Sequence, residues 1–280
     1  MKLNKPVLHF NAINRILQHN QLRGTHKKLS SPLLQLCPHP MKSVAKYSTH
    51  AYNQSFKKGM GIGVGHFITF EGIEGCGKST QIRLLGECLQ SRGYRVVMTR
   101  EPGGCPIADK IRAILLDADN SAMSPLSELL LYSAARAQHV SEVILPALEA
   151  DCVVLCDRFT DATIAYQSAG RGIERNTIET LNRLACSSIA PEITVLLDCD
   201  VQIGLGRARA RIEAAAGPRE ERFELESLEF HQRVRDSYLD LAMQQPQRFL
   251  KISAGGSVEE VSAIIANQIC TRLADSHAIC

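Results

Sequence analysis

The first 70 residues of the chain contain no aspartate and no glutamate. They carry ten lysine and arginine residues, so the remainder holds 22 basic and 29 acidic residues, a net charge of −7 beside +3 for the whole chain. Domains that bind DNA or RNA usually carry a basic surface. We therefore do not expect the folded part of this chain to bind nucleic acid.

The sequence also has no apolar run long enough to cross a bilayer and no apolar segment typical of a secretory signal. No C-x-x-C pair occurs among its ten cysteines, so the spacing indicates neither a zinc site nor a disulfide framework. Cysteines scattered through predicted strands and helices behave as small hydrophobic side chains. These absences predict an intracellular, cytoplasmic protein with no membrane contact.

Residues 1–64 differ from the rest of the chain, being rich in Lys, His, Asn, Gln and Ser and lacking a sustained apolar period. Three interpretations remain open. The segment is a dispensable translated leader upstream of a start at Met60 or Met41, a genuine disordered extension, or an organellar transit peptide, which would be basic and poor in acidic residues. We expect residues 65–280 to form the folded domain without it.

Residues 66–85 contain the strongest motif of the sequence. Phe67, Ile68 and Phe70 alternate as in a buried strand, and a glycine-rich turn and a helix follow. The turn matches G-x-x-x-x-G-K-[ST], the P-loop, whose backbone N–H groups cradle phosphates at a helix N-terminus. The residues predicted to bind a nucleoside triphosphate are Gly72, Ile73, Glu74, Gly75, Cys76, Gly77, Lys78, Ser79 and Thr80.

Three further features indicate which P-loop chemistry to expect. Lys78 can reach the β- and γ-phosphates, while the Ser79 hydroxyl and the Asp157 carboxylate suit Mg²⁺. The guanine-specifying N-K-x-D is absent, and Asp157 is followed by Arg158-Phe159 instead of the D-x-x-G of a GTPase. An arginine at this position suits a kinase that holds a second phosphate.

Strands and helices alternate along the chain from residue 66 onward. The helix after the P-loop is predicted to end near residue 92, and the last helix to begin at 258. Further helices are predicted at 107–116, 125–150, 176–186 and 228–243, and another runs from 157 to about 167. An Arg-rich segment follows the fourth strand. The strands are predicted near 66–70 and at 95–99, 152–156, 193–197 and 249–252. This alternation predicts an α/β fold with a five-stranded parallel sheet flanked by helices, and a site at the carboxyl ends of the strands.

Several motifs together resemble the thymidylate kinase family, in the order in which the family has them. They are residues 70–75 (FEGIEG), 99–104 (TREPGG), 131–136 (LYSAAR), 157–167 (DRF to AYQ) and 170–172 (GRG). The resemblance spans about residues 66–275. It implies a transferase that phosphorylates dTMP to dTDP with ATP and Mg²⁺ for dTTP supply, and it implies a homodimer.

The resemblance also implies roles for the acceptor site. Arg100, Arg112 and Arg158 match positions around the monophosphate, and Pro102 lies within the same motif. Tyr132 and Arg136, four apart on one helix face, match the pair that stacks on thymine and binds its carbonyl. Thr163 and Gln167 match positions at the base. Tyr166 matches the aromatic residue that excludes a 2′-hydroxyl, and Glu74 matches a carboxylate near the 3′-hydroxyl. One departure is Ala162, where many relatives carry serine.

The donor site is expected to use a lid. A P-loop without an internal arginine resembles the bacterial type of the family, which places arginines in a mobile lid over ATP. Residues 207–222 fit this role, and Arg209 and Arg211 are the catalytic candidates beside Lys78 and Arg158. Two alternatives remain open: another nucleoside-monophosphate kinase, and a nucleotide-binding regulatory protein without turnover.

Overall fold

A computed structural model describes residues 65–214 and 221–278. The leader predicted at 1–64 lies outside these residues, and so does the middle of the predicted lid. Among the described helices, none is both long enough and apolar enough to cross a bilayer.

The centre of the fold is a five-stranded sheet in which all neighbouring strands are parallel. Its strand order is β2-β3-β1-β4-β5, which confirms the predicted sheet. The central strands are apolar and buried because helices cover both faces of the sheet. The strands are β1 (His66–Glu71), β2 (Val96–Arg100), β3 (Val153–Asp157), β4 (Ile193–Asp198) and β5 (Phe249–Ser253).

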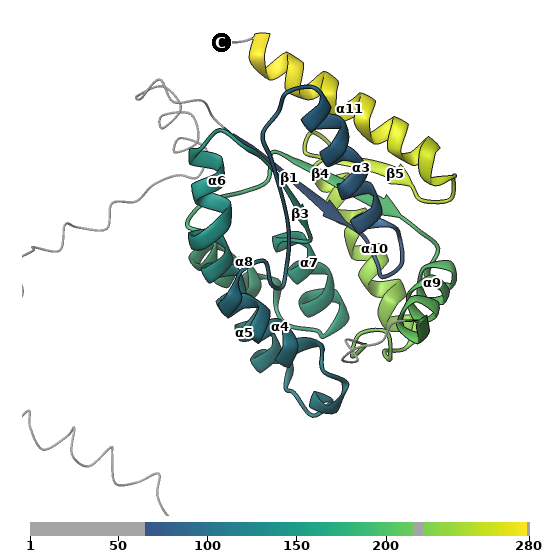
Figure 1. The fold of residues 1–280 in the computed structure, drawn as a ribbon. Coiled ribbons are helices and arrows are strands. Elements are labelled where there is room, and N and C mark those ends of the chain that lie inside the picture. The colour runs from purple at the N-terminus through teal and green to yellow at the C-terminus, as the bar shows by residue number, and fades with distance from the viewer. Residues whose placement is uncertain (1–64, 215–220, 279–280) are drawn as a thin grey trace, which may run out of the picture. The chain divides into compact units, whose positions relative to one another are not determined.

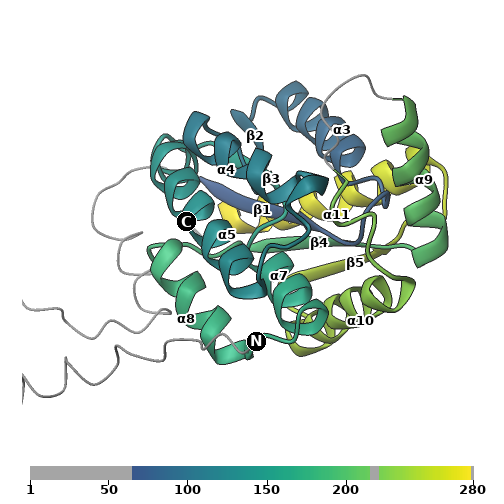
Figure 2. The ribbon, with the colours of Figure 1, turned by 90° about the horizontal axis from the view of Figure 1, so that it is seen from below.

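Helices α3 (Lys78–Ser91) and α11 (Val258–Ala278) pack side by side on one face of the sheet (Figure 1). Their apolar residues join Ile68 and Phe70 of β1 in the larger core cluster. Helix α10 (Leu228–Gln244) lies on the opposite side of the sheet from α3 (Figure 2).

The remaining helices surround this core. Predicted helix 125–150 is a continuous helical segment with a π-helical turn at Val140–Ile144, shortly before Pro146, which lacks a backbone N–H. A second π-helical turn follows α7 and carries part of the candidate site. These helices are α4 (Pro106–Leu116), η1 (Ala118–Asn120), α5 (Pro125–His139), η2 (Val140–Ile144), α6 (Leu145–Glu149), α7 (Thr160–Thr163), η3 (Ile164–Gly170), α8 (Arg175–Ala185) and α9 (Val201–Ala214).

Helix α9 was not predicted from the Arg-rich sequence. Its first turn is capped by Asp200, whose Oδ1 accepts hydrogen bonds from the backbone N–H groups of Gln202 and Ile203. The two glycines of this helix, Gly204 and Gly206, lower its intrinsic helix propensity, which hides it from sequence patterns. Tertiary packing against the P-loop offsets that loss.

Gly204 brings α9 into backbone contact with the P-loop. A Cβ at position 204 would lie 2.5 Å from the carbonyl oxygen of Glu74, and a Cβ at Gly75 would lie 1.9 Å from the carbonyl oxygen of Gly204. Neither position accepts a side chain without moving the backbone. A Cβ at Gly206 would meet no atom within 4 Å.

These two glycines give a matched pair of substitutions. We predict that Gly206→Ala raises the free energy of unfolding by about 0.5–1 kcal/mol, because alanine favours a helix over glycine. Gly204→Ala should instead lower it by about 1–3 kcal/mol, since it overpacks the contact with the P-loop. Urea unfolding of both variants measures the difference, and equal effects would contradict the close approach.

Candidate active site

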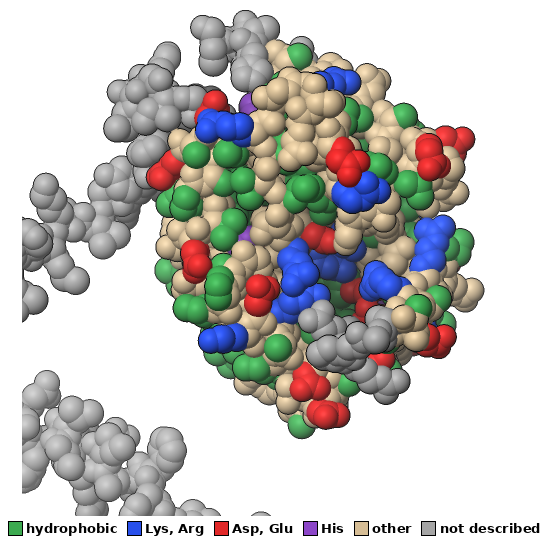
Figure 3. Space-filling model, viewed as in Figure 1, with side chains coloured by type: hydrophobic (Ala, Val, Ile, Leu, Met, Phe, Trp, Pro, Cys, Tyr) green, Lys and Arg blue, Asp and Glu red, His purple; other side chains and the backbone are tan. Residues whose placement is uncertain are grey.

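A cavity of about 930 Å³ opens at the carboxyl ends of β1, β2 and β3. Figure 3 shows lysine and arginine side chains gathered around a hollow on this face. Its lining comes from the P-loop, the ends of β2 and β3, α4, α9 and the segment before α10. This volume lies within the range of ligand pockets, about 300–1,000 Å³.

The P-loop forms the floor of this cavity. Gly72, Gly75 and Gly77 have φ values of 135°, 67° and 97°, which residues with a side chain rarely adopt. These glycines turn the loop back over the start of α3. Lys78 is buried, and its Nζ donates hydrogen bonds to the carbonyl oxygens of Gly72 (3.1 Å) and Ile73 (2.8 Å).

The predicted magnesium ligands lie next to each other. The Ser79 hydroxyl donates a 2.9 Å hydrogen bond to Oδ2 of Asp157, and both residues line the cavity. A hydroxyl and a carboxylate are oxygen ligands that Mg²⁺ prefers beside phosphates and water. Thr80 lines the same cavity, whereas Ile73 and Cys76 are buried beneath the loop.

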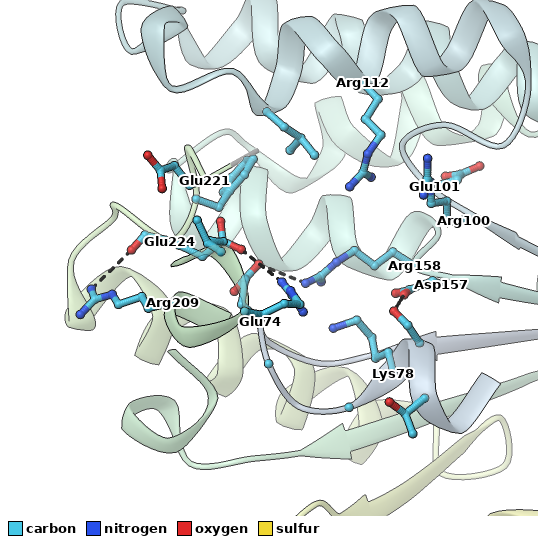
Figure 4. Close-up of a pocket in the computed structure, with 18 of the residues that line it drawn as sticks. Glu74, Lys78, Arg100, Glu101, Arg112, Asp157, Arg158, Arg209, Glu221 and Glu224 are labelled. Carbon is cyan, nitrogen blue, oxygen red and sulfur yellow. Dashed lines mark hydrogen bonds and ion pairs between the residues drawn. The ribbon is translucent and has the colours of Figure 1, made fainter. Parts of the chain in front are cut away.

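Arg158 extends from the end of β3 to the P-loop. Its backbone φ of 70° is in the left-handed region, and its N–H donates to the Phe70 carbonyl oxygen (3.0 Å). Its Nη2 lies 3.1 Å from Oε1 of Glu74, and its guanidinium lies 4.8 Å from the ring centroid of Tyr166. The strained backbone therefore directs the guanidinium toward the cavity, as Figure 4 shows.

Glu74 is a carboxylate whose side chain is 10% exposed, and it has three partners. Its Oε1 accepts hydrogen bonds from the Tyr166 hydroxyl (2.5 Å) and from Arg158, and its Oε2 lies 3.2 Å from Nδ1 of His231. Burial alone would raise the pKa of Glu74, but His231 and the cations Arg158 and Lys78 outweigh it and lower the pKa to about 2. The carboxylate is therefore ionised at neutral pH.

A smaller cavity of about 40 Å³ continues beyond Glu74 and Arg158. It is lined by the four residues that match base-binding positions of the family: Tyr132, Arg136, Thr163 and Gln167. The Thr163 Oγ1 is buried and has no hydrogen-bond partner among the described residues. Such a group favours a ligand with a polar edge at this point.

Arg136 is fully buried and held by three acceptors. Its Nε donates to Glu101 (2.7 Å), its Nη1 to Asn182 (2.7 Å) and its Nη2 to the Phe159 carbonyl oxygen (3.0 Å). A guanidinium has five N–H donors, so two remain for a ligand. Glu101 also lies 3.0 Å from Nδ1 of the buried His139.

The two other predicted phosphate residues lie on the opposite wall of the large cavity. Arg100 is 56% exposed and its Nη2 lies 3.6 Å from Oδ1 of Asp109. Arg112 donates from Nη1 to the carbonyl oxygen of Pro102 (3.0 Å), so Pro102 supports the arginine and is absent from the described lining of both cavities. In Figure 4, Arg112, Arg158 and Lys78 point into the same space.

The arginines of the predicted lid divide into two groups. Arg209 and Arg211 line the large cavity from α9, near Glu224: Arg209 donates to its carbonyl oxygen (3.4 Å), and Nη2 of Arg211 lies 3.8 Å from its Oε1. Arg222 instead is buried, with Nη1 2.7 Å from Oε2 of Glu128 and Nε donating to the Leu115 carbonyl oxygen. Arg222 thus anchors the end of the predicted lid to α4 and α5.

Sequence reasoning missed several buried residues of the site. Glu128 accepts hydrogen bonds from Gln167 and Arg171 besides pairing with Arg222. No spacing rule links residues so far apart in the chain. The other missed residues are Glu101, Phe223, Glu224 and His231, of which Glu101 and Phe223 line both cavities.

Glu71 is a further buried carboxyl directly before the P-loop. Its Oε1 accepts from the Phe159 backbone N–H (2.8 Å) and its Oε2 from the Tyr238 hydroxyl (2.7 Å). Burial and the neighbouring charge of Asp161 raise the pKa of Glu71 to about 7, against the lowering effects of Arg158 and these hydrogen bonds. The pKa of Glu71, at the end of β1, is therefore raised, whereas the pKa of Glu74, three residues later in the P-loop, is lowered.

Comparison with known proteins gives consistent matches. The model of the family described as thymidylate kinase matches residues 70–265. The thymidylate kinase of Pelobacter propionicus is 66% identical over 218 residues, 77% of this chain and 100% of the relative, and that of Geobacter sulfurreducens is 59% identical over 75% of this chain and 99% of the relative. The crystal structure of thymidylate kinase from Ehrlichia chaffeensis matches with a TM-score of 0.60 and 34% identity, covering 74% of this chain and 99% of that chain.

The raised pKa of Glu71 predicts a pH-dependent contribution to stability. The folded protein holds this proton up to about pH 7 and the unfolded chain only to about 4.5, so the stabilisation is lost as the pH rises between these values. Glu71→Gln carries no such proton. Urea unfolding should show the wild type losing about 2 kcal/mol more than Glu71→Gln between pH 5 and pH 8.

Glu87→Gln is the control, because Glu87 is exposed and pairs with the exposed Arg83 on the surface of α3. It should follow the wild type at both pH values. Parallel curves for Glu71→Gln and the wild type would contradict the raised pKa.

Proposed function

The chain belongs to the thymidylate kinase family and transfers a phosphoryl group from ATP to dTMP, giving dTDP, and we propose that the two cavities divide this work between donor and acceptor. The observation that carries the proposal is the position of Arg158. This arginine lines both cavities and lies beside the P-loop carboxylate Glu74.

The P-loop half of the large cavity is the ATP site. Backbone N–H groups at the start of α3 bind the phosphates, and Lys78 moves from the loop carbonyls to the β- and γ-phosphates. Ser79 and Asp157 would hold Mg²⁺, Asp157 through water. The ion would supply positive charge that offsets the negative charge of the phosphates.

The acceptor phosphate lies among Arg158, Arg112 and Arg100. Three cations there offset the repulsion between the dTMP phosphate and the incoming phosphoryl group, and hold the two in line. Arg158 contacts Glu74, Arg112 donates to the Pro102 carbonyl oxygen, and Arg100 lies beside Asp109.

Thymine occupies the smaller cavity. Tyr132 stacks on the ring, Arg136 donates to a ring carbonyl, and the Thr163 hydroxyl and Gln167 lie at the base edge. Tyr166 blocks the 2′ position, because its hydroxyl is fixed by Glu74, and Glu74 lies near the 3′-hydroxyl. Ala162 lines the same cavity and adds no polar group.

An ADP-release assay with dTMP, dUMP, CMP, GMP and AMP as acceptors tests the assignment of the base pocket. We predict that dTMP has the highest kcat/KM. A higher value for another monophosphate would assign the pocket to a different nucleobase. Absence of turnover with all five would favour a regulatory nucleotide-binding protein.

Residues 207–222 act as the lid of this kinase domain, which spans residues 65–280. The two arginines that line the donor cavity meet the charge on the γ-phosphoryl group and exclude water from it. Arg222 is the fixed end of the lid, because its three contacts tie it to α4 and α5.

The lid assignment predicts the effect of a double substitution. Arg209→Ala with Arg211→Ala should lower kcat by about 10²–10³, because arginines on a transferring phosphoryl group contribute about 10³–10⁵ in related chemistry. The Kd of dTMP should stay within twofold. The matched control is Arg207→Ala on the same helix, which should retain kcat; weaker dTMP binding with unchanged kcat in the double variant would move these arginines to the acceptor site.

The active protein is a homodimer in the cytoplasm. Helices α4 and α5 pack together and expose large apolar side chains, among them Ile107, Ile114, Leu126 and Leu130. Such side chains on neighbouring helices suit a second copy of the chain. Location in an organelle is the alternative if residues 1–59 are a transit peptide.

A further inference from the structure

Arg158 is held from two directions. On the cavity side its Nη2 pairs with Glu74, as described above. On the inner side its Nη1 donates a 3.1 Å hydrogen bond to the hydroxyl oxygen of Tyr238, a residue of α10 that is 1% exposed. The second contact lies outside the described lining of both substrate cavities.

Glu71 completes this inner support. The Tyr238 hydroxyl donates to Oε2 of Glu71 (2.7 Å), and Oε1 of the same carboxylate accepts from the backbone N–H of Phe159 (2.8 Å). One carboxylate therefore holds the residue after Arg158 by its backbone and the tip of Arg158 through Tyr238. The buried Glu71 therefore supports both the backbone next to Arg158, which is left-handed at that residue, and the Arg158 side chain.

The direction of each hydrogen bond is fixed by chemistry when Glu71 is ionised. A guanidinium only donates, so the Tyr238 oxygen accepts from Arg158, and its single hydrogen goes to Glu71. Without the tyrosine hydroxyl, Nη1 of Arg158 loses this acceptor and Glu71 loses a donor. The ring of Tyr238 would remain, edge-on to Tyr166 at 6.4 Å between centroids.

We propose that Glu71 and Tyr238 are positioning residues of the phosphoryl transfer, which hold the guanidinium of Arg158 at the acceptor phosphate. This inference rests on the role given to Arg158 under the proposed function. Neither residue touches substrate. Their effect on the reaction passes through Arg158 alone, and this property separates positioning from a general contribution to the core.

The test is a cycle of variants with dTMP as the varied substrate and ATP saturating. Tyr238→Phe keeps the ring and removes the hydroxyl, and we expect kcat/KM for dTMP to fall about 3–10-fold, the loss typical of one hydrogen bond. KM for ATP should stay within twofold. Tyr94→Phe, in the loop between α3 and β2, is the matched control and should change neither value.

The same substitution in an Arg158→Ala background decides the mechanism. If Tyr238 acts through Arg158, adding Tyr238→Phe to Arg158→Ala should change kcat/KM by less than twofold. An equal 3–10-fold loss in both backgrounds, or no loss in either, would overturn the proposal. Wild-type kcat/KM in Arg158→Ala alone would instead remove Arg158 from the acceptor site and contradict the proposed function as well.

Glu71→Gln is the second variant, which keeps the test independent of how well Tyr238→Phe folds. Its amide oxygen accepts one of the two hydrogen bonds, so we expect a loss in kcat/KM for dTMP that is again absent in the Arg158→Ala background. Persistence of the loss without Arg158 would limit Glu71 to a structural role.

Discussion

The ion pair between Arg158 and Glu74 joins the end of β3 to the P-loop, and the geometry of the site depends on it. Each partner is constrained on its far side: Arg158 by its left-handed backbone and Tyr238, Glu74 by Tyr166 and His231. Removing one member of such a buried pair leaves an uncompensated charge. Both residues line the two cavities, so the cluster lies where the cavities meet, and this is the point at which the proposed transfer would take place.

The sheet, the P-loop and several helix starts could be predicted because they depend on residues close together in the sequence. Buried parallel strands are nearly all apolar, so the sheet could be predicted from short apolar runs, with boundaries within one residue or so for β3 and β4. The P-loop was predictable because glycine at fixed spacing is required for its backbone. The helix caps Ser124 and Ser227, which accept from Ser127 N–H and Phe230 N–H, mark their helices in the sequence.

Contacts between distant residues account for what the sequence could not predict. Helix α9 contains two glycines, and its stability comes from packing on the P-loop, which no local propensity reports. Arg222 resembles its neighbours in an arginine-rich segment, yet Glu128, 94 positions earlier, buries it. His231 beside Glu74 and Tyr238 beside Glu71 are likewise pairings across more than 150 residues. Family resemblance pointed to residues that line the two cavities, but not to these supporting residues.

A crystal structure of the chain with dTMP, Mg²⁺ and an unreactive ATP analogue tests the central claim most directly. We predict the dTMP phosphate within about 3 Å of the Arg158 guanidinium, with thymine against Tyr132 and the γ-phosphate analogue beside Lys78. Arg158 should keep its contact with Tyr238 in that complex. A dTMP phosphate bound away from Arg158, with the arginine still paired only to Glu74 and Tyr238, would contradict the account.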